Sequence, residues 1–126
     1  MVKTVVFFGT APSRGEVVLS SKPIGYPFRL KRIMARFPPG CANLVRQRYL
    51  IADDGSVGTG ALVSGVSVLQ DAGQVDYLVG DDCSKTLDHE VEHPTAGGFL
   101  KVQAVNDDFA DHGVDVQMTI EVTGQE

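Results

Sequence analysis

The hydrophobic pattern is clearest in the last quarter of the chain. Over residues 114–122 every second residue is apolar and the residues between are polar. Successive side chains of a strand point to opposite faces, so this alternation predicts a half-buried β-strand. A second strand-like run covers residues 99–105, and the turn-forming residues 106–113 separate the two runs. We therefore expect the two runs to form a hairpin.

The rest of the chain alternates short apolar runs with turn residues. The pattern predicts further strands over residues 4–8, 16–20, 28–37, 43–52, 66–69, 75–79 and 85–93. In the run 28–37 the apolar parity changes near Lys31 and Arg32, which predicts a β-bulge. No helical run of ten residues is present. This spacing favours an all-β fold, a β-sandwich arranged as a jelly roll or similar Greek key of about eight strands.

Length and composition indicate one domain over residues 1–126. No stretch approaches the roughly 20 apolar residues of a membrane helix, so no membrane partner is expected. The apolar run after Lys3 is shorter than the core of a secretory signal, and we expect folding in a cytoplasm. Cys41 and Cys83 lie beside turns, and in that compartment they are expected to be reduced thiols.

Charge is distributed unevenly along the chain, whose net charge is −5. Residues 1–52 hold nine Lys or Arg and one acidic residue, a net charge of +8. Residues 53–126 hold two Lys or Arg and fifteen acidic residues, a net charge of −13. Two interpretations are open: the charges pair across neighbouring strands, or a basic face of one subunit meets an acidic face of another. The second predicts a homo-oligomer, a trimer or ring, with these interface residues: Arg29, Lys31, Arg32, Arg36, Arg46 and Arg48.

The same basic residues also raise the question of nucleic-acid binding. Phe28 and Tyr49 lie among them and are of the type that stacks on bases. A dedicated nucleic-acid binder, however, normally shows a basic domain, and this chain is acidic overall. Nucleic acid is therefore not an expected partner.

Residues 89–93, His-Glu-Val-Glu-His, match the letters of a zinc-protease motif. That chemistry needs a helix, because only there do residues i and i+4 lie close enough to share one metal ion. Pro94 follows at once, and residues 87–93 alternate as a strand does. In a strand the two histidines are about 13 Å apart, too far for one zinc ion. We therefore expect a structural strand, no catalytic residues and no enzyme.

Three acidic loops carry oxygen ligands of the kind that calcium uses. They contain Asp53 and Asp54, Asp81 and Asp82, and the stretch 106–111. None has the spacing of an EF-hand, and such residues in loops usually bond their own backbone. No cofactor is expected; calcium is the alternative considered, with Asp107, Asp108 and Asp111 as its candidate ligands.

Four stretches carry a resemblance in pattern: residues 23–33, 37–40, 74–80 and 98–108. Together they resemble the compact jelly-roll proteins found among the structural genes of tailed phages, which include capsid-decorating and other virion surface proteins. The resemblance implies a non-enzymatic structural protein that self-associates and joins a capsid-like assembly. It also implies that the protein resides in the virion after assembly in the host cytoplasm.

Similar strand patterns occur in carbohydrate-binding modules, whose sites are often exposed aromatic residues on one sheet. The chain has no Trp and three Tyr, which counts against a platform for stacking sugars. A module for a glycan or another small ligand, with calcium in the acidic loops, is the alternative function.

Overall fold

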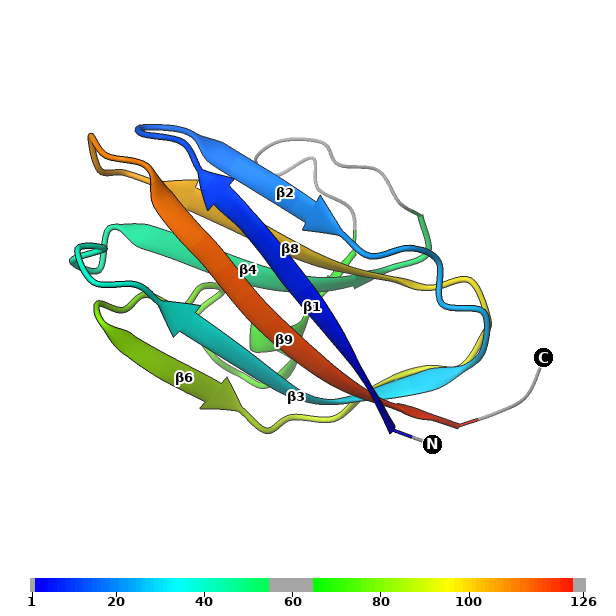
Figure 1. The fold of residues 1–126 in the computed structure, drawn as a ribbon. Helices are drawn as coiled ribbons and strands as arrows, with labels where there is room; N and C mark the ends of the chain where they lie inside the picture. The colour runs from blue at the N-terminus through cyan, green and yellow to red at the C-terminus, as the bar shows by residue number, and fades with distance from the viewer. Residues whose placement is uncertain (1, 55–64, 124–126) are drawn as a thin grey trace.

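The computed structural model describes residues 2–54 and 65–123. These residues form two β-sheets that pack face to face (Figure 1). Their elements are β1 (Val2–Ala11), β2 (Glu16–Ser20), β3 (Phe28–Phe37), β4 (Val45–Ala52), β5 (Val66–Ser67), α1 (Val68–Asp71), β6 (Cys83–Leu87), β7 (Val91–His93), β8 (Phe99–Asn106) and β9 (His112–Val122).

The two sheets have the strand order of a jelly roll. One sheet runs β1-β9-β3-β6, and the other runs β2-β8-β4-β5, with every pairing antiparallel. β6 pairs with the second half of β3 and β7 with its first three residues, so the two short strands share one position in the sheet. The described strands thus fill eight positions, and the predicted all-β sandwich is confirmed.

The predicted hairpin of the last two long strands is wrong. β8 lies between β2 and β4, whereas β9 lies between β1 and β3 in the other sheet. Residues 107–111 therefore cross from one layer to the other. An alternating pattern shows that a strand has a buried side, but both sheets of a sandwich offer such a side, and the pattern does not choose between them.

The predicted alternation of β9 is confirmed. Its buried apolar residues are Val114, Val116, Met118 and Ile120, and the residues between them reach the surface. On β8, by contrast, five consecutive residues, 100–104, are buried. Gln103, on the outer side, accepts a hydrogen bond from Arg48 of β4 and donates one to Glu16 of β2. Side chains of the neighbouring strands thus cover this side of β8, and burial does not alternate along it.

The predicted bulge in β3 is confirmed. The register of β3 against β9 shifts between Leu30 and Arg32. Leu30 and Ile33 are both buried in the core, so the two residues between them, Lys31 and Arg32, turn to the outer side together. The bulge thus places two adjacent cations on one surface.

The region after residue 65 departs most from the predicted strands. Of the predicted strand 66–69, Val66 and Ser67 pair with β4, and residues 68–71 form α1 in place of a strand. Ser67 Oγ accepts a hydrogen bond from the backbone N–H of Gln70, which caps this helical turn. Within residues 2–54 and 65–123 no helix has the length and apolar content needed to cross a membrane.

Two other strand predictions need correction. Residues 75–79 form no strand, and Leu78 alone makes an isolated bridge to Gln47. The predicted strand over 85–93 is interrupted at 88–90, where the chain leaves β6 and enters β7. Short apolar runs of this kind do not distinguish strands from other buried segments by periodicity alone.

Candidate interaction surfaces

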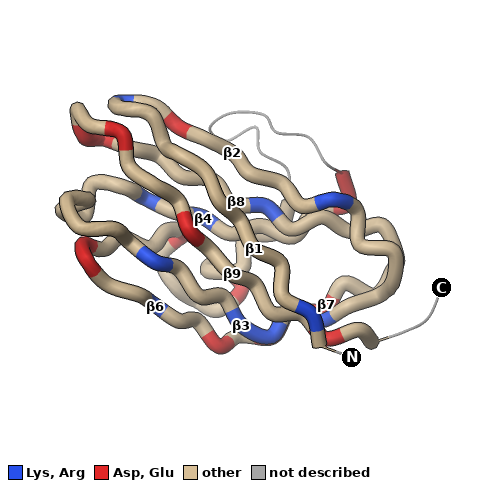
Figure 2. Tube along the Cα trace, in the orientation of Figure 1, with Lys and Arg blue, Asp and Glu red and all other residues tan. Residues whose placement is uncertain are grey.

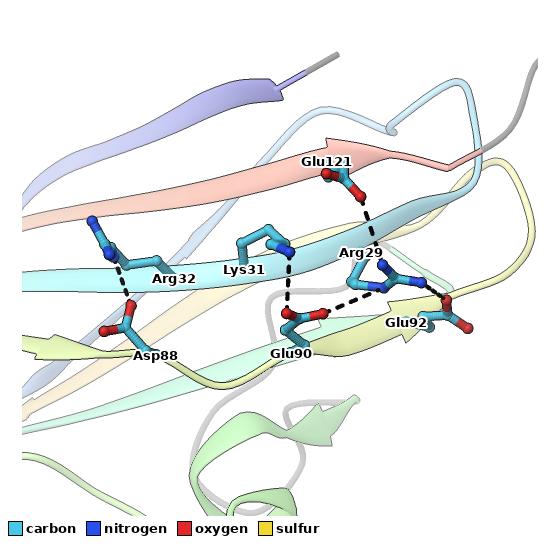
Figure 3. Close-up of polar contacts among 7 residues, drawn as sticks. All are labelled: Arg29, Lys31, Arg32, Asp88, Glu90, Glu92 and Glu121. Carbon is cyan, nitrogen blue, oxygen red and sulfur yellow. Dashed lines mark hydrogen bonds and ion pairs between the residues drawn. The ribbon is translucent and has the colours of Figure 1, made fainter.

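A charged cluster covers the outer side of β3 near its start (Figure 3). Arg29 donates a hydrogen bond to Glu92 and forms ion pairs with Glu90 at 3.7 Å and with Glu121 at 3.6 Å. The sheet register explains these contacts, because Arg29 lies opposite Glu92 of β7 and opposite Glu121 of β9. These carboxylates, with the hydrogen bond to Glu92 first, hold the pKa of Arg29 above its ordinary value.

The bulge supplies the other two cations of the cluster. Lys31 Nζ lies 3.1 Å from Glu90 Oε2, and Arg32 Nε lies 2.6 Å from Asp88 Oδ1. Asp88 and Glu90 belong to the break between β6 and β7. The bulge of β3 therefore lies beside this break, in the neighbouring position of the same sheet. A shallow groove of about 370 Å³ runs over this contact, lined by Val2, Lys31, Arg32, Asp88, Glu90 and Thr119.

The predicted interface residues do not form one face. Arg29, Lys31, Arg32 and Arg36 lie on β3, whereas Arg46 and Arg48 lie on β4 in the other sheet. Arg46 forms an ion pair with Asp107 at 3.3 Å, and Arg48 forms one with Asp76 at 2.9 Å. On the other sheet, the basic start of β3 lies side by side with the acidic β7 (Figure 2).

Arg36 is the exception among the six. It lies opposite Ser84 of β6 and Asp115 of β9, beside a small hollow of about 210 Å³. Within the described part of the chain it is the one member of the set that has no ion pair. The structure therefore pairs five of the six cations with acidic residues of the same chain.

The two histidines of the His-Glu-Val-Glu-His stretch point to different partners. His89 Nε2 lies 2.7 Å from Asp71, next to the end of α1. His93 is buried, stacks on Phe28 with 5.3 Å between ring centroids, and places Nε2 2.7 Å from Asp53. His93 Nδ1 lies 2.7 Å from the carbonyl oxygen of Thr95, so Nδ1 carries a proton that it donates. His89 thus joins the break between β6 and β7 to the end of α1, and His93 joins β7 to the segment after β4.

The carboxylates of the β8–β9 loop also have partners within the chain. Asp107 pairs with Arg46, and Asp111 accepts a hydrogen bond from the backbone N–H of Ser13. Asp108 lies 2.8 Å from His112 Nε2. That hydrogen bond, followed by one from the N–H of Phe109, lowers the pKa of Asp108. Among the residues that the structure describes, no group of three acidic, His or Cys side chains is placed to hold a metal ion, and calcium binding stays a prediction.

The two cysteines are free thiols. Cys41 is fully buried, and burial is the main cause that raises the pKa of its thiol. A thiol with a raised pKa is a poor nucleophile, because the thiolate is the reactive form. Cys41 is thus a packing residue of the core.

An apolar edge runs along the outer side of β1, and sequence reasoning missed it. Val2, Val6 and Phe8 expose 61%, 53% and 75% of their surface. The sequence held a signal, since residues 5–8 are all apolar and alternate residues of a strand point to opposite sides. With Val5 and Phe7 directed inward, Val6 and Phe8 are left on the outside. Along β1 Lys3 is the one charged residue (Figure 2).

Comparison with known proteins gives matches by structure only. No family model matches the chain, and no curated protein matches it in sequence. A chain from the structure of broad bean stain virus superposes with a TM-score of 0.51, covering 98% of this chain and 87% of that one at 5% identity. This likeness shows the fold, a jelly roll, without showing a function.

Two further matches are more distant. A chain of the Bacillus endospore appendages, described as disulfide-linked pili, has a TM-score of 0.46 and 11% identity, covering 99% of this chain and 88% of that one. A chain of infectious bursal disease virus, Gx strain, has a TM-score of 0.44 and 10% identity over 98% of this chain. The present chain spans 33% of that viral protein, about a third of its length.

Proposed function

We propose that this protein is a non-enzymatic structural protein that self-associates and decorates the surface of a virion capsid. The observation that carries this proposal is the apolar edge, where Phe8 and its neighbours Val2 and Val6 meet water on one strand. Scattered apolar residues are normal on a surface, but several exposed apolar residues gathered on one side of one strand are more typical of a protein–protein contact. The stripe gives this domain a surface that association would cover.

The fold supports the same proposal. The strand order β1-β9-β3-β6 over β2-β8-β4-β5 is that of a jelly roll, and the chain superposes along almost its whole length on a chain of a plant virus. A jelly roll also serves proteins of other kinds, so this support concerns the class of architecture. The tailed-phage decoration role is the finer part of the proposal.

The use of the histidines favours a structural role over an enzymatic one. All three bond a carboxylate of the same chain that fastens a loop or a helix end: His89 to Asp71, His93 to Asp53, and His112 to Asp108. These pairs are accounted for by the fold alone.

Native mass tests the proposal. Size exclusion with light scattering, in low salt and in about 1 M salt, should give a mass of two or more chains of 13.5 kDa. Salt screens charges but does not weaken apolar contacts, so association through the apolar edge should survive high salt. A monomer under both conditions would contradict the proposal and move support to the ligand-binding alternative.

If instead the six basic residues form the interface, association should depend on salt in the opposite way. An interface of that kind should loosen as salt rises. The double variant Arg46→Glu/Arg48→Glu tests it directly, because single exposed ion pairs contribute only about 0–1 kcal/mol. A lower mass of the double variant would support the basic interface, and an unchanged mass would argue against it.

A further inference from the structure

Among the described residues, β1 is an edge strand that pairs with another strand on one side only. It lies at the end of its sheet and pairs with β9 at all ten of its positions without a shift. In an antiparallel pair alternate residues direct their backbone N–H and C=O groups to the partner, so the other residues of β1 direct theirs away from β9. In the described part of the chain, no other backbone–backbone hydrogen bond involves residues 2–11, and the carbonyl oxygen of Ala11 accepts one from the side chain of Asn106.

The edge also lacks the features that usually keep such strands apart. Natural edge strands are protected by short length, proline, bulges or charged side chains. β1 has ten residues, no proline and no bulge. Its one charge, Lys3, turns toward its own domain, with Nζ 4.8 Å from the centre of the Tyr26 ring. β1 is therefore open to pairing with another strand.

The other edges of the molecule are protected. β2 has five residues and β5 has two. The outer position of the first sheet is divided between β6 and β7, with the charged residues of the break between them. Within the described residues, β1 is thus the one edge long enough to match another β1. A second copy of this chain is the partner that satisfies the whole strand.

We propose that β1 pairs antiparallel with β1 of a second copy, around a two-fold axis at Val6. This inference rests on the proposed self-association and specifies its contact. Outward residues of β1 are the even-numbered ones, and a continuous sheet must place them opposite one another. Any two-fold axis centred on a residue does so; the axis at Val6 also pairs all of residues 2–10 of both copies and leaves out Ala11, whose carbonyl is bonded to Asn106. Val2 then faces Thr10, Thr4 faces Phe8, and Val6 faces its own copy.

This register packs the apolar edges and separates the charges. Phe8 of one copy lies diagonal to Val6 and Val2 of the other, a distance that aromatic side chains span. Lys3 lies opposite Gly9, so no like charges face each other across the new pair. A register centred on Lys3 would instead place two ammonium groups opposite each other.

The acidic residues of β9 do not prevent this contact. Asp115 lies opposite Phe8, and Glu121 lies opposite Val2, each one strand in from the edge. Across the joined sheet the β9 strands of the two copies are three strand spacings apart, about 14 Å. That exceeds the screening length of about 8 Å at physiological salt, so their repulsion is largely screened.

The test uses opposite charges at the two-fold axis. In Val6→Lys and in Val6→Glu, like charges meet across the axis, and each variant alone should associate at least about tenfold more weakly than the wild type. An equimolar mixture of the two places Lys opposite Glu and should restore association as a heterodimer. Val6 is half exposed and points outward, so both variants should fold, as circular dichroism would check.

Gln117→Lys is the matched control. Gln117 lies directly opposite Val6 but on β9, on the same outer side and one strand away from the edge. The control should keep the wild-type mass, whereas association through the flat outer face of the sheet would be disrupted by it. Slow amide exchange of alternate β1 residues in the wild type, lost in Val6→Lys, would give a second readout.

The outcomes separate the two proposals. A wild-type oligomer that both Val6 variants leave intact would overturn pairing through β1 while leaving self-association standing. Separation by each variant with no recovery in the mixture would overturn the two-fold axis at Val6. A wild-type monomer would overturn both the pairing and the proposed self-association.

Discussion

The outer side of one sheet contains two regions of opposite character. The charged cluster on β3, β7 and the end of β9 brings together three cations and four carboxylates, drawn in Figure 3. The apolar edge on β1, two strands away, has Val2, Val6 and Phe8 exposed and no ion pair between described residues. The first region satisfies its charges within the chain. The second leaves apolar surface and outward backbone groups without a partner among the residues that the structure describes.

The ion pairs of the charged cluster account for the uneven charge along the sequence. The basic first half and the acidic second half meet because β3 lies between β9 and the β6–β7 strands. Arg29, for example, lies directly opposite Glu92 on one side and Glu121 on the other. Of the two interpretations of the charge pattern, pairing across neighbouring strands is the one that the structure shows. A conspicuous charge run can thus be a feature of the fold, while the free surface lies elsewhere.

The largest effect is expected from the core beneath the charged cluster. Phe28 is fully buried below this region and stacks on His93. Phe28→Ala should lower the free energy of unfolding by about 3–5 kcal/mol, because the substitution leaves a cavity as well as losing apolar burial. Urea unfolding would measure it. Met34→Ala is the control on the same strand, half exposed and expected to change stability by about 0.5 kcal/mol or less. A loss of less than about 1 kcal/mol in Phe28→Ala would show that the packing of Phe28 contributes little to the stability of the fold.

A smaller effect, on association alone, is expected at the apolar edge. Phe8→Ser should weaken self-association about tenfold, about 1.4 kcal/mol, and change unfolding by only about 0.5 kcal/mol. Sedimentation equilibrium together with urea unfolding would separate the two quantities. Phe109→Ser is the matched control, since Phe109 is 81% exposed but lies in the β8–β9 loop, beside Arg14. Equal loss of association in both variants would mean that any exposed aromatic residue suffices.

The smallest effect is expected on stability at low pH, from the loss of the charge on Asp108. The hydrogen bond to His112 lowers the pKa of Asp108 below its ordinary value of 3.8. The folded chain therefore binds this proton less readily than the unfolded chain does. The stabilisation is fully present above about pH 3.8 and is lost as the pH falls through the lower pKa of the folded state.

Asp108→Asn removes that contribution. The difference in stability between wild type and variant should shrink as the pH is lowered from about 5 to about 3, as measured by thermal unfolding. Asp82→Asn removes one charge from a different exposed loop and corrects for the change in net charge. A difference that stays constant over this range, after that correction, would show that the His112 contact does not favour the ionised form of Asp108.

Local features of this fold were predictable from the sequence. The bounds of β2 were predicted as observed, as were the alternation of β9 and the bulge between Leu30 and Arg32. Each depends on residues within a few positions of one another. Turn formers end a strand, a period of two marks its buried side, and a change of parity marks an extra residue.

The arrangement of these strands was decided by contacts between distant residues. β8 and β9 follow each other in sequence but belong to different sheets, and residues 68–71 turn into a helix at the end of a two-residue strand. Whether Arg29 is free or paired depends on Glu92, 63 positions further along the chain. Whether Phe8 is buried depends on what covers the outer side of β1, and within the described residues it stays 75% exposed. The alternation of a strand shows which of its residues share a side. Which other strands cover those sides and edges is determined only by the packing of the whole chain.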